Sequence, residues 1–158
     1  MSFRGCRMLF VAAAVLLVLP GHLWAASDDT KEKDSVLSTL DARVAQFLEG
    51  VSLGQSHSAF ADLLSGSQLL KQSDALKDLV VRTDDLEVKY GKYRAFEQVS
   101  AKRIGSDLVL MRYLYKCENF PVVWHFTFYR TPGAGETGSK AGTWRVVAVR
   151  FNTDLEQL

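Results

Sequence analysis

Cysteine is scarce in this sequence, which holds only Cys6 and Cys117 among its 158 residues. Cys6 precedes an apolar run near the N-terminus, and we expect it to leave with a signal peptide. One remaining cysteine excludes an intramolecular disulfide. A lone thiol in an exported protein can pair with another chain or react, but a single cysteine is more often a small buried apolar residue. We expect the buried role for Cys117.

A long run of charges of one sign is also absent. The chain has 19 basic and 18 acidic residues, and loss of Arg4 and Arg7 with a signal peptide would leave 17 basic residues. The charges are mixed along the chain. We therefore expect no binding to nucleic acid or to anionic lipid.

Histidine is rare as well, with three residues in the whole chain. After signal removal only His57 and His125 remain, far apart in the sequence. Neither is accompanied by the carboxylates or thiolates that complete a metal site. The sequence predicts no metal and no cofactor.

The chain has no apolar run of the roughly 20 residues that a membrane span needs. Its apolar stretch, Met8–Leu19, is shorter and follows Arg4 and Arg7. A basic start, a short apolar run and small residues at the end are typical of a secretory signal. We predict a signal peptide over residues 1–25, cleaved after Ala25. The protein would then be periplasmic or extracellular, without a stable membrane anchor; an uncleaved anchor is the alternative.

The remaining chain has the length of one domain. Residues 26–34 are polar and predict a flexible N-terminus, and residues 35–158 predict a single domain. Asp34 and Ser35 offer a cap for a first helix, and Ser56 or Ser58 for a second short helix. A third helical stretch follows from Leu69 to Tyr90, with Ser73 as its cap. In the first of these, apolar residues recur at helical spacing: Val36, Leu37, Leu40, Val44, Phe47, Leu48 and Val51.

Four strands are predicted after Gly91, where Val, Tyr, Phe and Trp become frequent and turn residues separate the segments. The predicted strands are Tyr93–Ile104, Asp107–Glu118, Val122–Thr131 and Thr143–Thr153. Helices followed by an antiparallel four-strand meander describe an α+β domain.

The alternation within the two middle strands predicts the inner face of the sheet. We expect Cys117 opposite Val122, Tyr115 opposite Trp124 and Tyr113 opposite Phe126. This register leaves one face wholly apolar or aromatic and places polar residues on the other, whereas a slip of one residue would mix the two faces. The helices should pack on the aromatic face.

Several segments resemble the nuclear transport factor 2-like superfamily, the cone-shaped fold also seen in ketosteroid isomerases. They are Y-G-K-Y-R-A-F-E (Tyr90–Glu97), L-V-L-M-R-Y-L-Y-K, P-V-V-W-H-F-T-F-Y-R and T-W-R-V-V-A-V-R-F-N-T-D. They also resemble small exported bacterial members of unknown function. The resemblance covers about residues 36–158 and implies a curved sheet with the helices packed on it. It supports the fold rather than an activity.

The aromatic face is also the candidate binding site. Its rings could line a pocket for a small apolar or aromatic molecule, although such rings more often form plain core. The candidate pocket residues are Tyr113, Tyr115, Trp124, Phe126 and Phe128.

No catalytic residue is predicted. Enzymes of the cone fold place an acid or base in the cavity, and Asp62 with Tyr113 or Tyr115 could imitate that arrangement. Asp62 more naturally faces water, however, and His125 is expected to be exposed or in a subunit contact. We predict an exported domain that binds a small apolar molecule or an envelope protein, with a homodimer through the outer sheet face as a further option. The alternatives are an isomerase- or hydrolase-like enzyme and a structural module.

The segment R-T-P-G-A-G-E-T-G-S-K-A-G-T-W-R (Arg130–Arg145) fits G-x-G-x-x-G and approaches a phosphate-binding loop. Such loops must lead into a helix whose N-terminal amides hold the phosphate. Here a strand pattern resumes at Thr143, and Lys140 follows Ser139 rather than preceding it. The segment therefore predicts a long, mobile hairpin loop and no nucleotide site.

Overall fold

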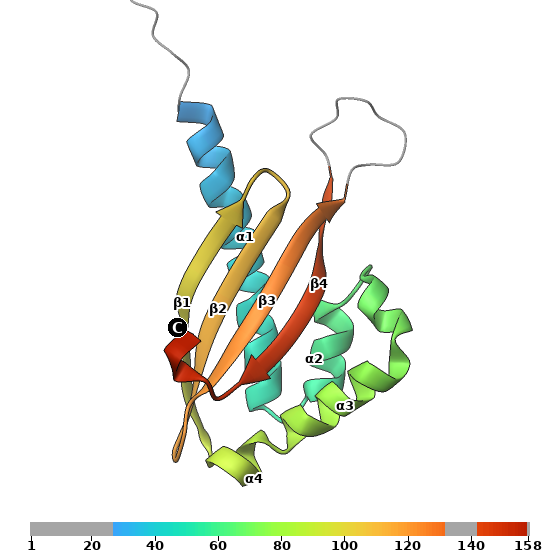
Figure 1. The fold of residues 1–158 in the computed structure, drawn as a ribbon, viewed down its shortest axis with the longest axis vertical. Coiled ribbons are helices and arrows are strands. Elements are labelled where there is room, and N and C mark those ends of the chain that lie inside the picture. Colours follow the sequence, from blue (N-terminus) through green and yellow to red (C-terminus); the bar gives the residue numbers. More distant parts are fainter. Residues whose placement is uncertain (1–26, 132–141, 158) are drawn as a thin grey trace, which may run out of the picture.

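The computed structural model describes residues 27–131 and 142–157. The predicted signal peptide and most of the glycine segment lie outside these residues. Helices come first and a four-strand antiparallel meander follows, which confirms the predicted α+β fold (Figure 1). The elements are α1 (Ser27–Ser52), α2 (Ser56–Leu63), η1 (Gln68–Lys71), α3 (Ser73–Asp84), α4 (Leu86–Tyr90), β1 (Tyr93–Ile104), β2 (Leu108–Cys117), β3 (Val122–Thr131), β4 (Thr143–Asn152) and η2 (Leu155–Gln157).

The first helix carries the predicted apolar stripe into the core. Leu40, Val44, Phe47, Leu48 and Val51 are all at most 7 % exposed. The helix begins at Ser27 rather than at the predicted cap near Asp34. Extending an existing helix fixes one residue per added hydrogen bond, so a polar segment can continue a helix that packing has already stabilised. Apolar periodicity therefore locates the packed part of α1 and not its start.

The predicted third helical stretch is divided into η1, α3 and α4. The α3 helix ends where the Asp85 N–H donates to the carbonyl of Val81. A new helix then starts at Leu86, whose side chain is buried. Gly91 ends α4 with φ of 86°, a conformation that glycine adopts without strain. The short α4 turns the chain toward β1.

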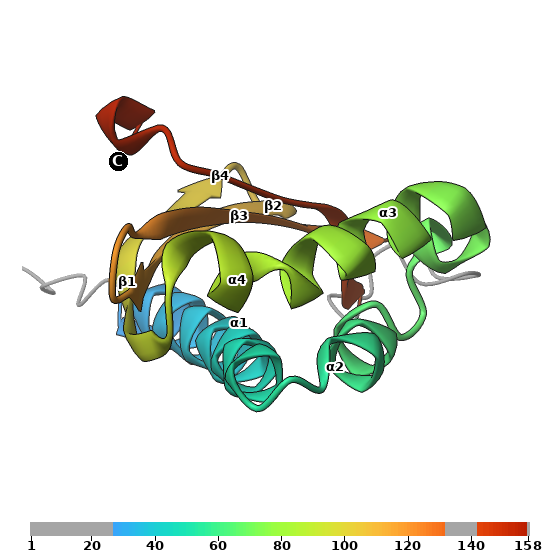
Figure 2. The same cartoon turned by 90° about the horizontal axis from the view of Figure 1, so that it is seen from below.

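The sheet has the order β1-β2-β3-β4, and its strand bounds lie within one residue of the predicted ones. It is curled, with α1 and α2 on one side of it and with α3 and α4 running past its near end (Figure 2). The chain after β4, including η2, lies on the opposite side. Among the described residues, no helix is long and apolar enough to cross a membrane.

The predicted register between β2 and β3 is wrong by two residues. Tyr115 pairs with Val122 and Tyr113 with Trp124. Cys117 instead pairs with Tyr93 on β1, and the Glu118 N–H donates to the Lys92 carbonyl at 2.9 Å. The end of β2 is therefore held by β1, and the loop to β3 is longer than expected. A shift of two residues keeps every side chain on its predicted face.

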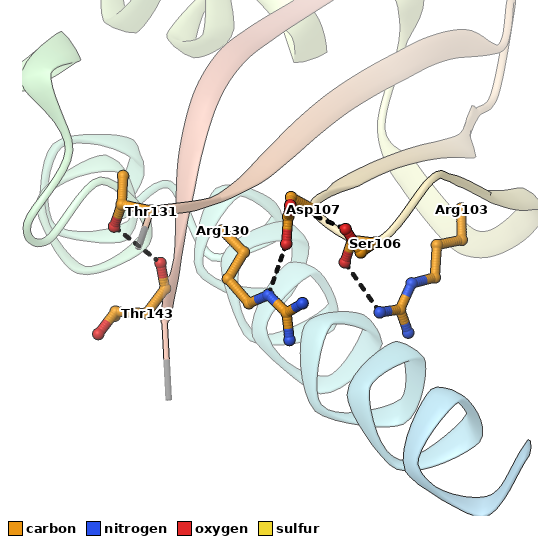
Figure 3. Close-up of polar contacts among 6 residues, drawn as sticks. All are labelled: Arg103, Ser106, Asp107, Arg130, Thr131 and Thr143. Atoms are coloured by element: carbon orange, nitrogen blue, oxygen red, sulfur yellow. Dashed lines mark hydrogen bonds and ion pairs between the residues drawn. The ribbon is translucent and has the colours of Figure 1, made fainter. Parts of the chain in front are cut away.

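Polar contacts fasten the opposite end of the sheet (Figure 3). The Arg130 Nε donates to Asp107 Oδ1 at 2.8 Å, and the Arg103 guanidinium donates to the Ser106 carbonyl at 2.8 Å. Hydrogen bonds from Ser106 and Arg130 lower the pKa of Asp107. Nearby, Thr131 pairs with Thr143, so the glycine segment does connect two antiparallel strands. A phosphate loop would feed a helix instead.

Candidate functional site

The five predicted pocket residues form the centre of the core. Phe47 of α1 meets Trp124 and Phe126 edge to face, at ring-centroid distances of 5.3 and 5.7 Å. Such contacts are typical of a packed aromatic core. Of the five, Tyr115 lines a hollow between the described elements. All five are at most 3 % exposed: Tyr113, Tyr115, Trp124, Phe126 and Phe128.

The Tyr113 hydroxyl has a carboxylate partner that the sequence did not indicate. Its hydroxyl donates to Asp41 Oδ1 on α1. The Gln98 amide donates to the same carboxylate oxygen at 3.0 Å and to the Tyr113 hydroxyl at 3.2 Å. Burial and the Asp41 carboxylate raise the pKa of Tyr113. Asp62 lies exposed on α2, which confirms the prediction that its side chain faces water.

Asp41 was detectable in the sequence in principle. It directly follows the buried Leu40 on a helix whose apolar stripe was recognised. An acid beside such a stripe can reach a polar atom of the sheet below it. The sequence does not show that α1 packs on the middle of β2, and this packing makes Asp41, rather than another helix carboxylate, the partner of Tyr113.

A cavity of about 260 Å³ opens where the C-terminal end of α1, the end of α3 and α4 meet the strands β1 and β2. We call it the mouth cavity. This end of the molecule faces the viewer in Figure 2. Twelve residues line the mouth cavity: Val51, Ser52, Gly54, Ser56, Thr83, Asp84, Leu86, Glu87, Gly91, Tyr93, Tyr115 and Cys117.

Buried polar groups contribute to the wall of the mouth cavity. Ser56, Thr83 and Tyr115 are 2 %, 2 % and 3 % exposed. The Thr83 hydroxyl donates to the Leu79 carbonyl at 2.7 Å. No hydrogen bond to the hydroxyl of Ser56 or Tyr115 is formed by any described residue. Neither hydroxyl oxygen is among the fully buried polar atoms that lack a hydrogen bond, so both are open to the cavity, where a small molecule or water can reach them.

The mouth cavity has a negative electrostatic character. Burial, followed by the charge of Glu87, raises the pKa of the Cys117 thiol. Burial is also the main cause that raises the pKa of Tyr115, and Glu87 adds to it. Burial and the charge of Glu49 raise the pKa of Tyr93. These groups stay neutral near pH 7, and the thiol is a poor nucleophile in this state.

The hairpin between β2 and β3 supports the outer wall of the mouth cavity. The Asn119 N–H donates to the Tyr90 carbonyl at 2.9 Å. A Cβ atom at Gly91 would lie 2.9 Å from the Glu118 Cβ and 3.0 Å from the Asn119 amide nitrogen. Only glycine fits both this close approach and the positive φ at this position. The sequence predicted that Gly91 ends a helical stretch, but it did not indicate that Gly91 lines a cavity.

Two further hollows lie between helices. One, of about 330 Å³, separates α2 from α3 and is mainly apolar, with the exposed His57 and Lys77 in its wall. The other, of about 480 Å³, lies between α1 and α2 and contains Asp62. Arg43 in this second hollow donates to the carbonyls of Leu63 and Trp144, which ties α1 to α2 and β4.

His125 lies on the outer face of the sheet but is only 9 % exposed, so it is not the exposed histidine that was expected, and its alternative role in a subunit contact stays a prediction. Its neighbours across the strands are Arg112 on β2 and Arg150 on β4. Asn152 and Asp154 lie within reach of the imidazole and act to raise its pKa. Burial first, and then the two arginines, lower the pKa of His125. The C-terminal segment that follows β4 was not recognised as a cover for this face.

No protein family, curated protein or solved structure matches the chain. The resemblance to the nuclear transport factor 2-like superfamily therefore stays a prediction. Within residues 27–131 and 142–157, no group of three His, Cys, Asp or Glu side chains could hold a metal ion. The site must be interpreted from its own geometry.

Proposed function

We propose that this chain is an exported, non-catalytic domain that binds a small molecule in the mouth cavity. One observation supports this most strongly: Tyr115 is 3 % exposed, lines the cavity, and has no hydrogen-bond partner for its hydroxyl among the described residues. Ligand sites combine apolar walls with a few placed polar groups. Here Val51, Leu86 and the tyrosine rings supply the apolar part of the wall.

The proposal changes the site that the sequence suggested. The rings of Trp124, Phe126 and Phe128 are at most 1 % exposed and stabilise the domain as core. The binding surface moves to the end of the aromatic face, where Tyr115 meets Tyr93. A small aromatic or apolar molecule can contact these rings there and hydrogen-bond the hydroxyls of Ser56 and Tyr115.

A fragment screen by nuclear magnetic resonance tests this proposal. We expect uncharged aromatic fragments to shift the backbone amide signals of Ser56, Tyr115 and Cys117 at millimolar or lower concentration. Ser52→Trp, which places a large ring in the cavity wall, should abolish the shifts. Ser38→Trp, on the exposed side of the same helix, is the matched control. Hits that map only to other surfaces would contradict the proposal.

An enzyme is the second candidate, because the carboxylate of Glu87 lines the same cavity as two tyrosines and a thiol. A carboxylate in such a site can act as a general base. Incubation of an identified ligand with wild-type protein and with Glu87→Gln separates the two functions. Conversion by wild type alone supports an enzyme, and unchanged ligand from both proteins supports a binding domain.

A partner surface is proposed on the outer sheet face, either for a second copy of the chain or for an envelope protein. Ile104 pairs with Leu108, which pairs with Tyr129, so an apolar row crosses three strands. Ile104 and Tyr129 are 43 % and 39 % exposed. Sedimentation should detect a dimer that Tyr129→Glu dissociates. A wild-type monomer at high concentration would exclude the homodimer.

A further inference from the structure

The charged side chains of the mouth cavity all have one sign. Among the described residues that line it, only Asp84 and Glu87 carry a carboxylate, and both side chains are exposed. Glu49 lies close enough to raise the pKa of Tyr93. None of the described lining residues is a lysine, an arginine or a histidine. A bound group of positive charge would therefore meet attraction from several carboxylates and no repulsion within the lining.

Three cations near the lining in sequence have other partners. Lys89 pairs with Asp85 at 3.2 Å, and Arg94 pairs with Glu118. The Arg82 guanidinium lies 4.9 Å from the ring centroid of Phe151. These contacts direct the three cations to groups other than Asp84 and Glu87.

Two aromatic rings lie beside the acidic edge. The centroids of Tyr93 and Tyr115 are 4.8 Å apart, and their planes are inclined by 36°. Tyrosine faces attract ammonium groups, and rings that gather around such a group are the usual means of binding it. The two rings, the two carboxylates and the hydroxyls of Ser56 and Tyr115 thus all belong to the lining of the same cavity.

Resting on the proposed function, we propose that the ligand of the mouth cavity is an organic ammonium ion, bound by the rings of Tyr93 and Tyr115 and the carboxylates of Asp84 and Glu87. The cavity of about 260 Å³ fits one small cationic group with its substituents. The hydroxyls of Ser56 and Tyr115 are placed to hydrogen-bond a polar substituent of that ion. Both are at least nine-tenths buried, which distinguishes this site from an acidic surface.

Calorimetric titration with choline and with its uncharged isostere 3,3-dimethylbutan-1-ol tests the inference. We expect choline to bind about tenfold more tightly than the alcohol. Glu87→Gln should weaken choline binding about fivefold, and Tyr93→Leu should weaken it further. Asp78→Asn is the matched control, because Asp78 is an exposed acid of α3 outside the cavity lining.

Equal binding of both compounds, unchanged by Glu87→Gln, would overturn the ammonium ion and leave the cavity as a site for neutral molecules. Failure of both compounds to bind would also overturn it, and the uncharged aromatic fragments would still test the cavity itself. Flotation with phosphatidylcholine vesicles separates two supporting results. If the protein floats with the vesicles, its ligand is the headgroup of a lipid. If the protein binds choline but does not float, its ligand is a free ammonium compound.

Discussion

Tyr93 and Tyr115 lie side by side on neighbouring strands, with ring centroids 4.8 Å apart. Tyr115 is buried and Tyr93 is half-buried. The contact stands where the aromatic core ends and the mouth cavity begins. The two rings therefore link the packing of the domain to its proposed ligand site.

The hydroxyls of Tyr113 and Tyr115 should differ in their effect on stability. Tyr113→Phe removes the hydrogen bond to Asp41 and should lower the free energy of unfolding by about 1–2 kcal/mol. Tyr115→Phe removes a hydroxyl without a described partner and should change it by less than about 0.5 kcal/mol. Urea unfolding of both variants gives the comparison. An equal loss would mean that the Tyr115 hydroxyl has a structural partner.

Cys117 should react with iodoacetamide more slowly than an ordinary thiol near pH 7. Its pKa is raised by burial and by Glu87, and the thiolate is the reactive form. The alkylation rate should still be increasing at pH values more than about one unit above 8.5, where an ordinary cysteine is almost fully ionised and its rate has levelled off. Peptide mapping measures the rate at Cys117, with glutathione in parallel. If the rate at Cys117 levels off at a lower pH than the rate for glutathione, the raised pKa would be refuted.

Stability should fall as the pH drops below about 6.5, because the lowered pKa of His125 favours proton uptake by the unfolded chain. Above that pH the imidazole is neutral in the folded and in the unfolded chain, so His125 does not lower the free energy of unfolding there. The slope from this one group is at most about 1.4 kcal/mol per pH unit.

Unfolding at several pH values measures this slope. His125→Gln should flatten it between the ordinary pKa and the lowered one. His57→Gln is the control, because His57 is exposed on α2. If both variants keep the wild-type slope, His125 is not the group responsible.

Gly91→Ala should destabilise the domain by about 2–3 kcal/mol, because a positive φ and a close contact act together. Gly54→Ala is a matched control, since Gly54 has φ of 71° but a Cβ atom there would meet nothing within 4 Å. It should cost about 1 kcal/mol. Thermal unfolding of both variants separates the effect of the positive φ from that of the close contact. Equal losses of stability would show that Glu118 and Asn119 move aside at little cost in free energy.

The sequence predicted the fold well because its signals are local. Strand alternation fixes the face of each side chain, so Tyr113 and Trp124 were placed in the core even though their register was wrong by two residues. The start of α1 could not be located, since it depends on propagation from a packed helix. The break between α3 and α4 depends on how Leu86 packs, which no spacing reveals.

The candidate site was only partly predictable. Tyr115 was selected from the aromatic pattern, but its neighbours Thr83 and Glu87 come from helices that meet the sheet only in the folded domain. The same is true of Asp41, which lies 72 residues from its partner Tyr113. Contacts between distant segments decide which polar side chains face a cavity, and single-sequence patterns do not report them.

Native mass spectrometry of the protein, purified without denaturation, tests the central claim most directly. We predict that the wild type and Ser38→Trp carry a bound small molecule and that Ser52→Trp does not, because its new ring fills the mouth cavity. A ligand retained equally by Ser52→Trp, or no ligand with any of the three proteins under conditions that preserve weak complexes, would contradict the account.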